Sequence, residues 1–395
     1  MAVAGLSGAD TAEPGFGLYV HWPFCRSKCP YCDFNSHVRE TVDTARWGAA
    51  LRAELAHYGR LTAGRRLTSV FFGGGTPSLM PSSVVGGLLD ELSRYWSLHP
   101  DLEVTLEANP TSAEAAAFAG FRAAGVNRLS IGVQALDDVA LRFLGRQHSA
   151  AEALRALGLA RRVFPRISFD LIYGRPGQAL PDWRTELARA LAEGPDHLSL
   201  YQLTIEEGAA FHGAVRRGDW QPLDEETQVA LFEDTRERLE ADGLPAYEVS
   251  NHARPGAECR HNLVYWRYGD YVGIGPGAHG RLTGVDGRRR ATRQHRAPEV
   301  WLQRVEAESH ATTREDALSA EEVRDELLMM GLRLRDGLTR GDFERVCRHQ
   351  PEALLSAEPL DRLQRGGYLV LDSAGLRATP LGLQRLDAVL AHLLG

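Results

Sequence analysis

Residues 17–34 read GLYVHWPFCRSKCPYCDF, an apolar run followed at once by three cysteines. The run at 17–22 is rich in aliphatic and aromatic residues, which is typical of a buried β-strand. Cys25, Cys29 and Cys32 follow it with the spacing C-x3-C-x2-C. Because these thiols crowd into eight residues of a chain with an odd total of five cysteines, metal ligation is a better interpretation than disulfides.

Runs of the same kind recur along the chain and alternate with helical stretches, two of which we place at 111–124 and 225–242. The six runs lie at 17–22, 67–72, 102–107, 127–133, 166–173 and 197–204. Apolar strands separated by helices predict a parallel sheet covered by those helices, with right-handed crossovers. We therefore predict an α/β fold in which a partial (β/α)6 barrel forms the main body.

The domain organisation is predicted from where this alternation starts and stops. We expect an N-terminal segment at 1–16, a core with its extension at 17–300, and a smaller C-terminal domain at 301–395. The last part reads as helix, hairpin and helix, an α+β pattern that resembles a winged helix. Its residues 319–395 hold 10 Arg against 12 Asp and Glu, so packing or a lid is favoured over DNA binding.

The bulk composition excludes several classes of protein. Of the 395 residues, 44% are hydrophobic and 25% are charged, as in ordinary globular proteins. The net charge of −7 argues against nucleic-acid binding, which needs a basic surface. We expect no transmembrane segment, since no apolar run reaches the roughly 18 residues that a spanning helix needs. The first 18 residues contain no Lys or Arg and predict no secretory signal, so we expect the cytoplasm.

Unusual residues follow the C-terminal ends of the predicted strands, where barrel enzymes build their sites. The glycines of "GGGTP" (73–77) let a ligand approach the backbone closely. Glu107, Gln134 and Asp170 lie near strand ends, and Arg146 lies beyond the fourth strand. Together these polar groups predict a ligand that carries ammonium, carboxylate and hydroxyl groups.

The three cysteines leave two alternatives open. A structural zinc site could recruit His21 or His37 as a fourth ligand. An iron–sulfur cluster of the 4Fe–4S type normally takes four thiolates, one per iron, so three would leave one iron open to a non-protein ligand. The second alternative explains the missing fourth cysteine without another residue.

C-x3-C-x2-C followed by "GGGTP" resembles the radical S-adenosylmethionine (SAM) superfamily, in which SAM chelates the open iron. A longer series of motifs is similar to the family of oxygen-independent coproporphyrinogen III oxidases and HemW haem chaperones. These motifs are "LYVHWPFCRSKCPYCDFNSH", "FFGGGTPS", "LEANP", "LSIGVQ", "LGRQH", "DLIYG", "YEVSNHARPG", "HNLVYW" and "GDYVGIGPGAHG".

Two departures favour the chaperone side of that family. The oxidases carry a further cysteine two positions after the third, and this chain has Phe34 there. The H-N-x-x-Y-W signature of HemW proteins is complete in His261, Asn262, Tyr265 and Trp266. The chain therefore resembles the HemW type more than the oxidases.

The resemblance implies a role for each matching residue. Cys25, Cys29 and Cys32 would hold the 4Fe–4S cluster. Residues expected to form the SAM pocket are Tyr19, Tyr31, Gly74, Gly75, Thr76, Glu107, Gln134, Arg146 and Asp170. Ala278 and His279 match a further strip of the site. Haem would be bound by His261, with Tyr265 and Trp266 packed on the porphyrin.

These roles imply a haem chaperone that binds the cluster, SAM and haem, and that passes haem to an acceptor protein such as a respiratory membrane enzyme. We expect a cytoplasmic protein that can lie at the periphery of the inner membrane, with a homodimer as an open alternative. The other function in view is a radical SAM oxidase acting on coproporphyrinogen. Whether SAM is cleaved, and whether the chain is an enzyme, stays open.

Overall fold

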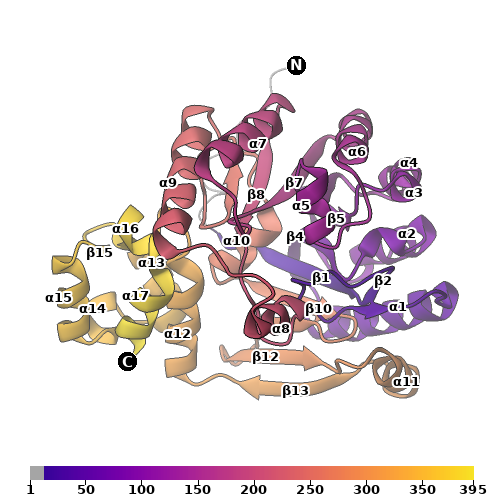
Figure 1. The fold of residues 1–395 in the computed structure, drawn as a ribbon. Helices are drawn as coiled ribbons and strands as arrows, with labels where there is room; N and C mark the ends of the chain where they lie inside the picture. The colour runs from indigo at the N-terminus through magenta and orange to yellow at the C-terminus, as the bar shows by residue number, and fades with distance from the viewer. Residues whose placement is uncertain (1–12) are drawn as a thin grey trace.

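The computed structural model describes residues 13–395, so most of the predicted N-terminal segment lies outside the described residues. One sheet of eleven strands dominates the fold (Figure 1). In spatial order its strands are β13 (Thr312–Ala317), β12 (Arg289–Gln294), β11 (His279–Thr283), β10 (Asp270–Ile274), β1 (Phe16–Trp22), β4 (Arg66–Gly74), β5 (Ser97–Ala108), β6 (Arg128–Gln134), β7 (Arg166–Tyr173), β8 (His197–Gln202) and β9 (Asn251–Ala253).

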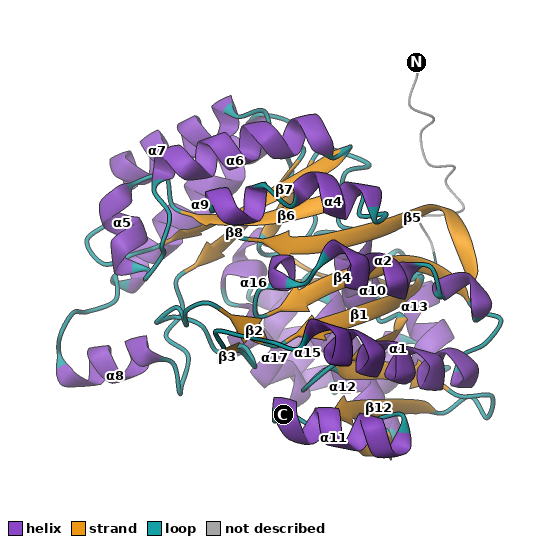
Figure 2. Cartoon of the chain, turned by 90° about the vertical axis from the view of Figure 1, so that its right-hand side faces the viewer, coloured by secondary structure: helices purple, strands orange, loops and turns teal. Residues whose placement is uncertain are grey.

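The six predicted strands are confirmed as β1, β4, β5, β6, β7 and β8, which pair in parallel in that order. Helices cover the outer side of this curved sheet (Figure 2). They are α1 (Thr44–Leu61), α2 (Ser82–Leu89), α3 (Ser112–Ala115), α4 (Phe118–Ala123), α5 (Asp138–Phe143), α6 (Ala150–Val163) and α7 (Leu180–Ala192). Because both faces of the strands are covered, β1 is buried at nearly every position, which explains its continuous apolar sequence. The predicted partial (β/α)6 barrel is therefore confirmed.

Helix boundaries follow the capping residues closely. The predicted helix at 111–124 begins where the Thr111 side chain accepts the Glu114 N–H and ends before Gly125, whose φ is +112°. Within these bounds it divides into α3 and α4. The predicted helix at 225–242 is α9 (Glu225–Ala241), which is followed by Gly243 with φ +78°. Caps thus set the ends of both helical regions.

The sheet extends beyond the barrel on the β1 side. Strand β10 adds to β1 in parallel, and β11, β12 and β13 continue the sheet in antiparallel order. Three further helices accompany the later strands: α8 (Ala210–Arg217), α10 (Arg260–Trp266) and α11 (Pro298–Glu308). Residues 301–317, which we assigned to the C-terminal domain, pack with the main sheet, because β13 pairs with β12 and Trp301 lies in the main core.

The C-terminal part has its own hydrophobic core, which includes Leu327, Phe343 and Leu376. Its helices are α12 (Ala320–Gly331), α13 (Arg340–Cys347), α14 (Pro351–Leu354), α15 (Ala357–Arg365), α16 (Pro380–Gln384) and α17 (Leu386–Leu394). Strands β14 (Leu338–Thr339), β15 (Leu369–Leu371) and β16 (Gly375–Ala378) form a small antiparallel sheet. Helices followed by a β-hairpin and two final helices agree with the predicted winged-helix-like domain, which lies at one side of the barrel (Figure 1).

Candidate functional site

The cysteine loop leaves the end of β1 and is held on both sides. Its first and last parts pair in parallel as β2 (Phe24–Cys25) and β3 (His37–Val38). The turn after β4 supports it, since the Gly75 N–H donates to the Trp22 carbonyl at 2.7 Å and the Thr76 N–H donates to the Phe24 carbonyl at 2.9 Å. The loop therefore has a fixed position over the C-terminal ends of the strands.

All three sulfur atoms have polar neighbours. The Thr76 hydroxyl donates to Cys25 Sγ at 3.4 Å, and Arg146 Nη1 donates to Cys29 Sγ at 3.4 Å. Cys32 Sγ lies 3.9 Å from the Ser36 hydroxyl. Hydrogen-bond donors beside sulfur stabilise thiolates, which are the form that binds iron.

The glycines at the end of β4 have a packing role in addition to the one that we predicted. A Cβ at Gly75 would lie 2.8 Å from the Phe24 carbonyl oxygen, and one at Gly74 would lie 2.6 Å from the His21 ring. Gly74 also has a φ of +112°, which side chains disfavour. Gly74 and Gly75 thus allow the end of β4 to pack closely against β1 and the start of the cysteine loop.

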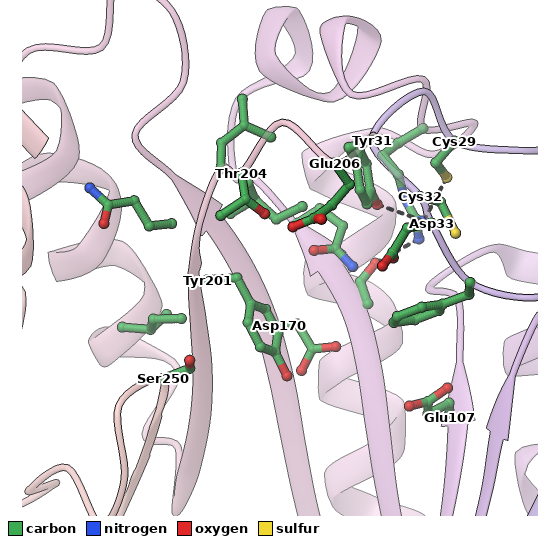
Figure 3. Close-up of a pocket in the computed structure, with 18 of the residues that line it drawn as sticks. Cys29, Tyr31, Cys32, Asp33, Glu107, Asp170, Tyr201, Thr204, Glu206 and Ser250 are labelled. Carbon is green, nitrogen blue, oxygen red and sulfur yellow. Dashed lines mark hydrogen bonds between the residues drawn. The ribbon is translucent and has the colours of Figure 1, made fainter. Parts of the chain in front are cut away.

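A cavity of about 1060 Å³ lies beside the cysteine loop and reaches α9 and α17. Figure 3 shows Cys29, Cys32, Asp170 and Tyr201 around this cavity, which we call the larger cavity because a smaller one adjoins it. It brings together the three cysteines and all but one of the predicted SAM residues, namely Tyr31, Gly74, Gly75, Thr76, Glu107, Gln134, Arg146 and Asp170. Side chains far apart in sequence meet here because parallel strands end on the same face.

Two of the predicted SAM residues in this wall each have a polar atom without a partner among the described residues. They are Gln134 Oε1 and Arg146 Nε, both buried, and Arg333 Nε in the same lining is a third such atom. Gln134 also has a φ of +70° at a register shift between β6 and β7, an uncommon conformation for a residue other than glycine. Arg146 is fixed by donation from Nη2 to Asn109 Oδ1 at 2.5 Å and to the Gly132 carbonyl at 2.8 Å. A buried polar atom without a partner is costly, so both atoms are suited to a polar ligand.

Burial changes the ionisation of two carboxyl groups in the same wall. It raises the pKa of Glu107 to about 8, and the nearby Asp170 carboxylate raises that pKa further. Burial also raises the pKa of Asp170 to about 6, while hydrogen bonds from Ser199 and Ser130 act in the opposite direction. A ligand with a cationic group would stabilise the charged form of both carboxyls.

A second, smaller cavity of about 370 Å³ lies on the β10 and β11 side of the cysteine loop. It shares Phe34, Gly74 and Glu107 with the larger cavity. Tyr19, predicted to belong to the SAM pocket, lines this second cavity instead, and its hydroxyl lies 2.9 Å from His21 Nδ1. The predicted strip at Ala278 and His279 lies here as well. The structure therefore divides the predicted residues between two adjoining cavities.

The predicted haem ligand His261 lines neither cavity. Its ring is 1% exposed and stacks on Phe71, with 5.2 Å between ring centroids. Nδ1 lies 2.9 Å from the Ser69 hydroxyl and Nε2 lies 2.8 Å from the Tyr265 hydroxyl. Burial lowers the pKa of His261 to about 3. With both ring nitrogens hydrogen-bonded inside the core, this geometry does not support His261 as an iron ligand.

The two aromatic residues predicted to pack on haem differ in position. Tyr265 lines the smaller cavity. Trp266 lies under the Arg333 guanidinium, which is centred 4.5 Å from the indole ring. That cation–π contact occupies a face that we had assigned to porphyrin.

Comparison with known proteins places the chain in a family. A model of the radical SAM superfamily matches residues 19–191, and a HemN C-terminal domain model matches residues 318–385. The heme chaperone HemW of Escherichia coli is 42% identical over 73% of this chain and 76% of its own. HemW of Mycobacterium tuberculosis is 38% identical over 96% of this chain and 95% of its own. The chain belongs to the HemW family of radical SAM proteins.

Other relatives extend this family and its fold. The mitochondrial radical S-adenosyl methionine domain-containing protein 1 of Bos taurus is 42% identical over 98% of this chain and 90% of its own. The solved structure of coproporphyrinogen III oxidase (HemN) from Escherichia coli superposes with a TM-score of 0.80 at 24% identity, over 96% of this chain and 90% of that one. The HemN likeness shows that the fold is shared.

The donor set fits the cofactors that the radical SAM family implies. Across residues 13–395, no three or more His, Cys, Asp or Glu side chains gather tightly enough to hold a single metal ion. A 4Fe–4S cluster has a different requirement, since each iron takes its own thiolate. Cys25, Cys29 and Cys32 supply three thiolates beside a cavity whose wall has unpartnered polar atoms. When bound, the cluster would supply one-electron chemistry to SAM.

Sequence reasoning missed two asparagines in this HemW-family site. Asn109, in the quoted "LEANP", holds Arg146 and also lines the larger cavity. Asn35 Nδ2 donates to the carbonyls of Pro276 and Arg296 at 2.9 and 3.0 Å, which ties the cysteine loop to the wall of the smaller cavity. Asn109 follows a strand end, the signal that identified Glu107, whereas nothing local marks Asn35.

Among the helices of the described residues, none is both long and apolar enough to cross a membrane.

Proposed function

We propose that this protein is a haem chaperone that binds a 4Fe–4S cluster, SAM and haem and transfers haem to an acceptor protein. The observation that carries the proposal is the match, at 38–42% identity, to proteins named heme chaperone HemW. Phe34 agrees with it, because the chain lacks a cysteine at this position.

The larger cavity has the chemistry that SAM requires. We assign the cluster to Cys25, Cys29 and Cys32, and SAM to the adjoining wall. The Arg146 guanidinium is suited to the SAM carboxylate, and Glu107 and Asp170 are suited to its ammonium and hydroxyl groups. Tyr31, Gly74, Gly75, Thr76 and Gln134 complete this pocket.

The setting of the transfer is a further part of the proposal. We infer that the protein works in the cytoplasm and meets its acceptor, a haem-requiring respiratory enzyme, at the periphery of the inner membrane. A role beside porphyrin biosynthesis, where haem becomes available, fits this setting. A homodimer is the assembly that we propose to test by light scattering on the cluster-loaded protein.

One experiment separates the chaperone from an oxidase. Protein with its cluster reconstituted under anaerobic conditions is divided between two assays. One measures haem binding by the Soret band, and the other measures turnover of coproporphyrinogen with SAM and a reductant. We expect saturable haem binding without turnover, followed by loss of haem to an apo-acceptor. Turnover of coproporphyrinogen together with only nonspecific haem binding would contradict the chaperone function and support the oxidase function.

A further inference from the structure

A cluster of aromatic side chains lies beside the cysteine loop, outside the main hydrophobic core. Its rings belong to Tyr31, Phe143, Phe211 and Trp220. None of these four side chains is part of the main core. Tyr31 belongs to the predicted SAM pocket, whereas the other three have no role in the sites described above. The purpose of these three rings therefore needs its own explanation.

Phe211 is at the centre of this aromatic cluster, and it is 6% exposed. Its ring stacks on Phe143 with 4.8 Å between centroids and meets Trp220 edge to face at 5.1 Å. The Tyr31 ring lies 6.5 Å from it, also measured between centroids. Aromatic pairs at such distances contribute stabilisation beyond the area that they bury. Phe211 thus joins the cysteine loop to α5 and to Trp220.

Phe211 and Trp220 belong to the long connection between β8 and α9, residues 203–224, which we call the α8 connection. Figure 2 shows its helix α8 projecting from the barrel. Most of the connection is exposed, and its buried residues are Ala209 and Phe211. A segment with few buried apolar contacts depends on those few for its position. The aromatic cluster is therefore the main anchor of the α8 connection.

The turn between the second and third cysteines is held by two separate segments. The α8 connection holds it through the Phe211 N–H, which donates to the Pro30 carbonyl at 2.9 Å. The residue that follows α5 and Leu144 holds it through packing, since a Cβ at Gly145 would lie 2.6 Å from Pro30 Cδ. Within the turn, the Cys32 N–H donates to the Cys29 carbonyl at 3.1 Å. Both thiols thus belong to one tight turn, and both move if Pro30 moves.

We propose that Phe211 and Trp220 are positioning residues for the cluster, because they hold the turn that carries two of its three thiolates. They touch no iron themselves and act through Pro30 and Tyr31. Groups that orient metal ligands from behind typically change metal affinity by about 10- to 100-fold when they are removed. The α8 connection therefore sets how firmly the protein retains its iron. This inference rests on the cluster of the proposed function and adds to it an element far from the cysteines in the sequence.

The test is the rate at which a ferrous-iron chelator removes iron from full-length protein, after anaerobic reconstitution of the cluster. Phe211→Ala and Trp220→Ala should each speed the loss of iron about tenfold. Trp220→Phe keeps an aromatic ring and should stay close to the wild-type rate. Phe164→Ala is the matched control, because Phe164 is 4% exposed and packs on Phe118 in the main core. It should lower the unfolding temperature without a change in the rate of iron loss.

A second measurement follows the α8 connection itself. Because coupling between two sites is reciprocal, loading the cluster should slow amide hydrogen exchange across residues 205–220 in the wild type. This slowing should be absent in Phe211→Ala. Exchange that is equal with and without the cluster in the wild type would overturn the positioning role.

The outcomes separate this inference from the proposed function. Wild-type rates of iron loss in both alanine variants, or an equal acceleration in Phe164→Ala, would overturn the positioning role and leave the chaperone function intact. A wild type that assembles no iron–sulfur cluster would overturn the proposed cofactor together with the positioning role. A wild type that retains its cluster and binds no haem would contradict the chaperone function, while faster iron loss in Phe211→Ala would still support the positioning role.

Discussion

Two glutamates of β5, Glu103 and Glu107, show how the two ends of the barrel differ. They lie four residues apart on a strand and face the same side. Glu103 accepts from Arg128 at 3.2 Å and from the Arg260 N–H at 2.8 Å, and Cys259 Sγ lies 3.5 Å away. Glu107 lines both cavities and has a raised pKa.

The comparison distinguishes polar groups that stabilise the fold, because they have partners within the protein, from polar groups that are available to bind a ligand. Around Glu103 the charges are satisfied inside the protein, since Arg128 also donates to the Ala257 carbonyl at 3.0 Å. Around Glu107 the wall retains unpartnered atoms of Gln134 and Arg146. Completed networks stabilise the protein, and incomplete ones at a cavity select what binds there.

The largest expected effect concerns the cysteines at the two ends. Replacing Cys25, Cys29 or Cys32 by serine should abolish the absorption near roughly 400 nm of the reconstituted protein, because serine is a poor ligand for cluster iron. Cys259→Ser should keep this absorption, since Cys259 belongs to the Glu103 network. Iron and sulfide analysis after anaerobic reconstitution provides the measurement. Loss of the cluster in Cys259→Ser, or stoichiometric zinc in place of iron in the wild type, would contradict the assignment of the cluster to the three cysteines of the loop.

The next largest effect is a loss of stability when one of the two glutamates is replaced. Glu103→Gln should lower the free energy of unfolding by about 3–5 kcal/mol, because it leaves the buried Arg128 guanidinium without its counter-charge. Glu107→Gln should cost far less, since it removes a carboxyl that burial already disfavours. Urea unfolding of both variants, followed by circular dichroism, gives the difference. Similar losses in the two variants would show that both ends serve stability alike.

A smaller effect is expected for SAM at the open end. Asp170→Asn should weaken SAM binding about tenfold, because a hydrogen bond to a charged group contributes about 1.5–3 kcal/mol. The cluster should be retained, since the side chains that act on the Asp170 carboxyl are Ser199, Arg146 and Ser130 rather than the cysteines. Anaerobic calorimetry measures the affinity, with the exposed Asp219→Asn as a matched control. An unchanged SAM affinity in Asp170→Asn would remove this residue from the pocket.

The smallest expected effect is a pH dependence of stability that arises from Glu107. Its pKa rises from 4.5 to about 8 in the folded, ligand-free protein. Between these values the folded state keeps a proton that the unfolded chain has released, so stability falls as the pH rises through this window. We expect a loss of about 1 kcal/mol, because solvent in the cavity moderates burial. Thermal unfolding should show a shallower slope for Glu107→Gln, and equal slopes would contradict the assignment.

Local patterns predicted the strands and the cysteine loop because their information is local. Each parallel strand is an apolar run bounded by turns, and a loop that follows β1 must lie over the strand ends. The position of β13 could not be predicted in this way. Its burial is only partial, so its sequence has no continuous apolar run, and pairing with β12 alone places it in the main sheet.

Similar sequence contexts also hid different roles. In "LEVTLE" both glutamates follow a leucine, yet Glu103 meets an arginine from β6 and Glu107 meets a cavity. His261 and His279 both belong to recognisable motifs, yet one is buried and the other is exposed. Gly75 was assigned to ligand approach, and the structure adds a packing constraint from the nearby Phe24 carbonyl.

By itself, the sequence determined the order of the parallel strands, the cysteine spacing and the family, because these depend on residues close together along the chain. The tertiary structure decided which buried polar groups have hydrogen-bond or ion-pair partners within the protein and which do not. It also divided one predicted pocket into two cavities and turned His279 toward the smaller one. The physical reason is that hydrogen bonding and burial are set by partners brought from distant segments, as Asn35 and Pro276 illustrate.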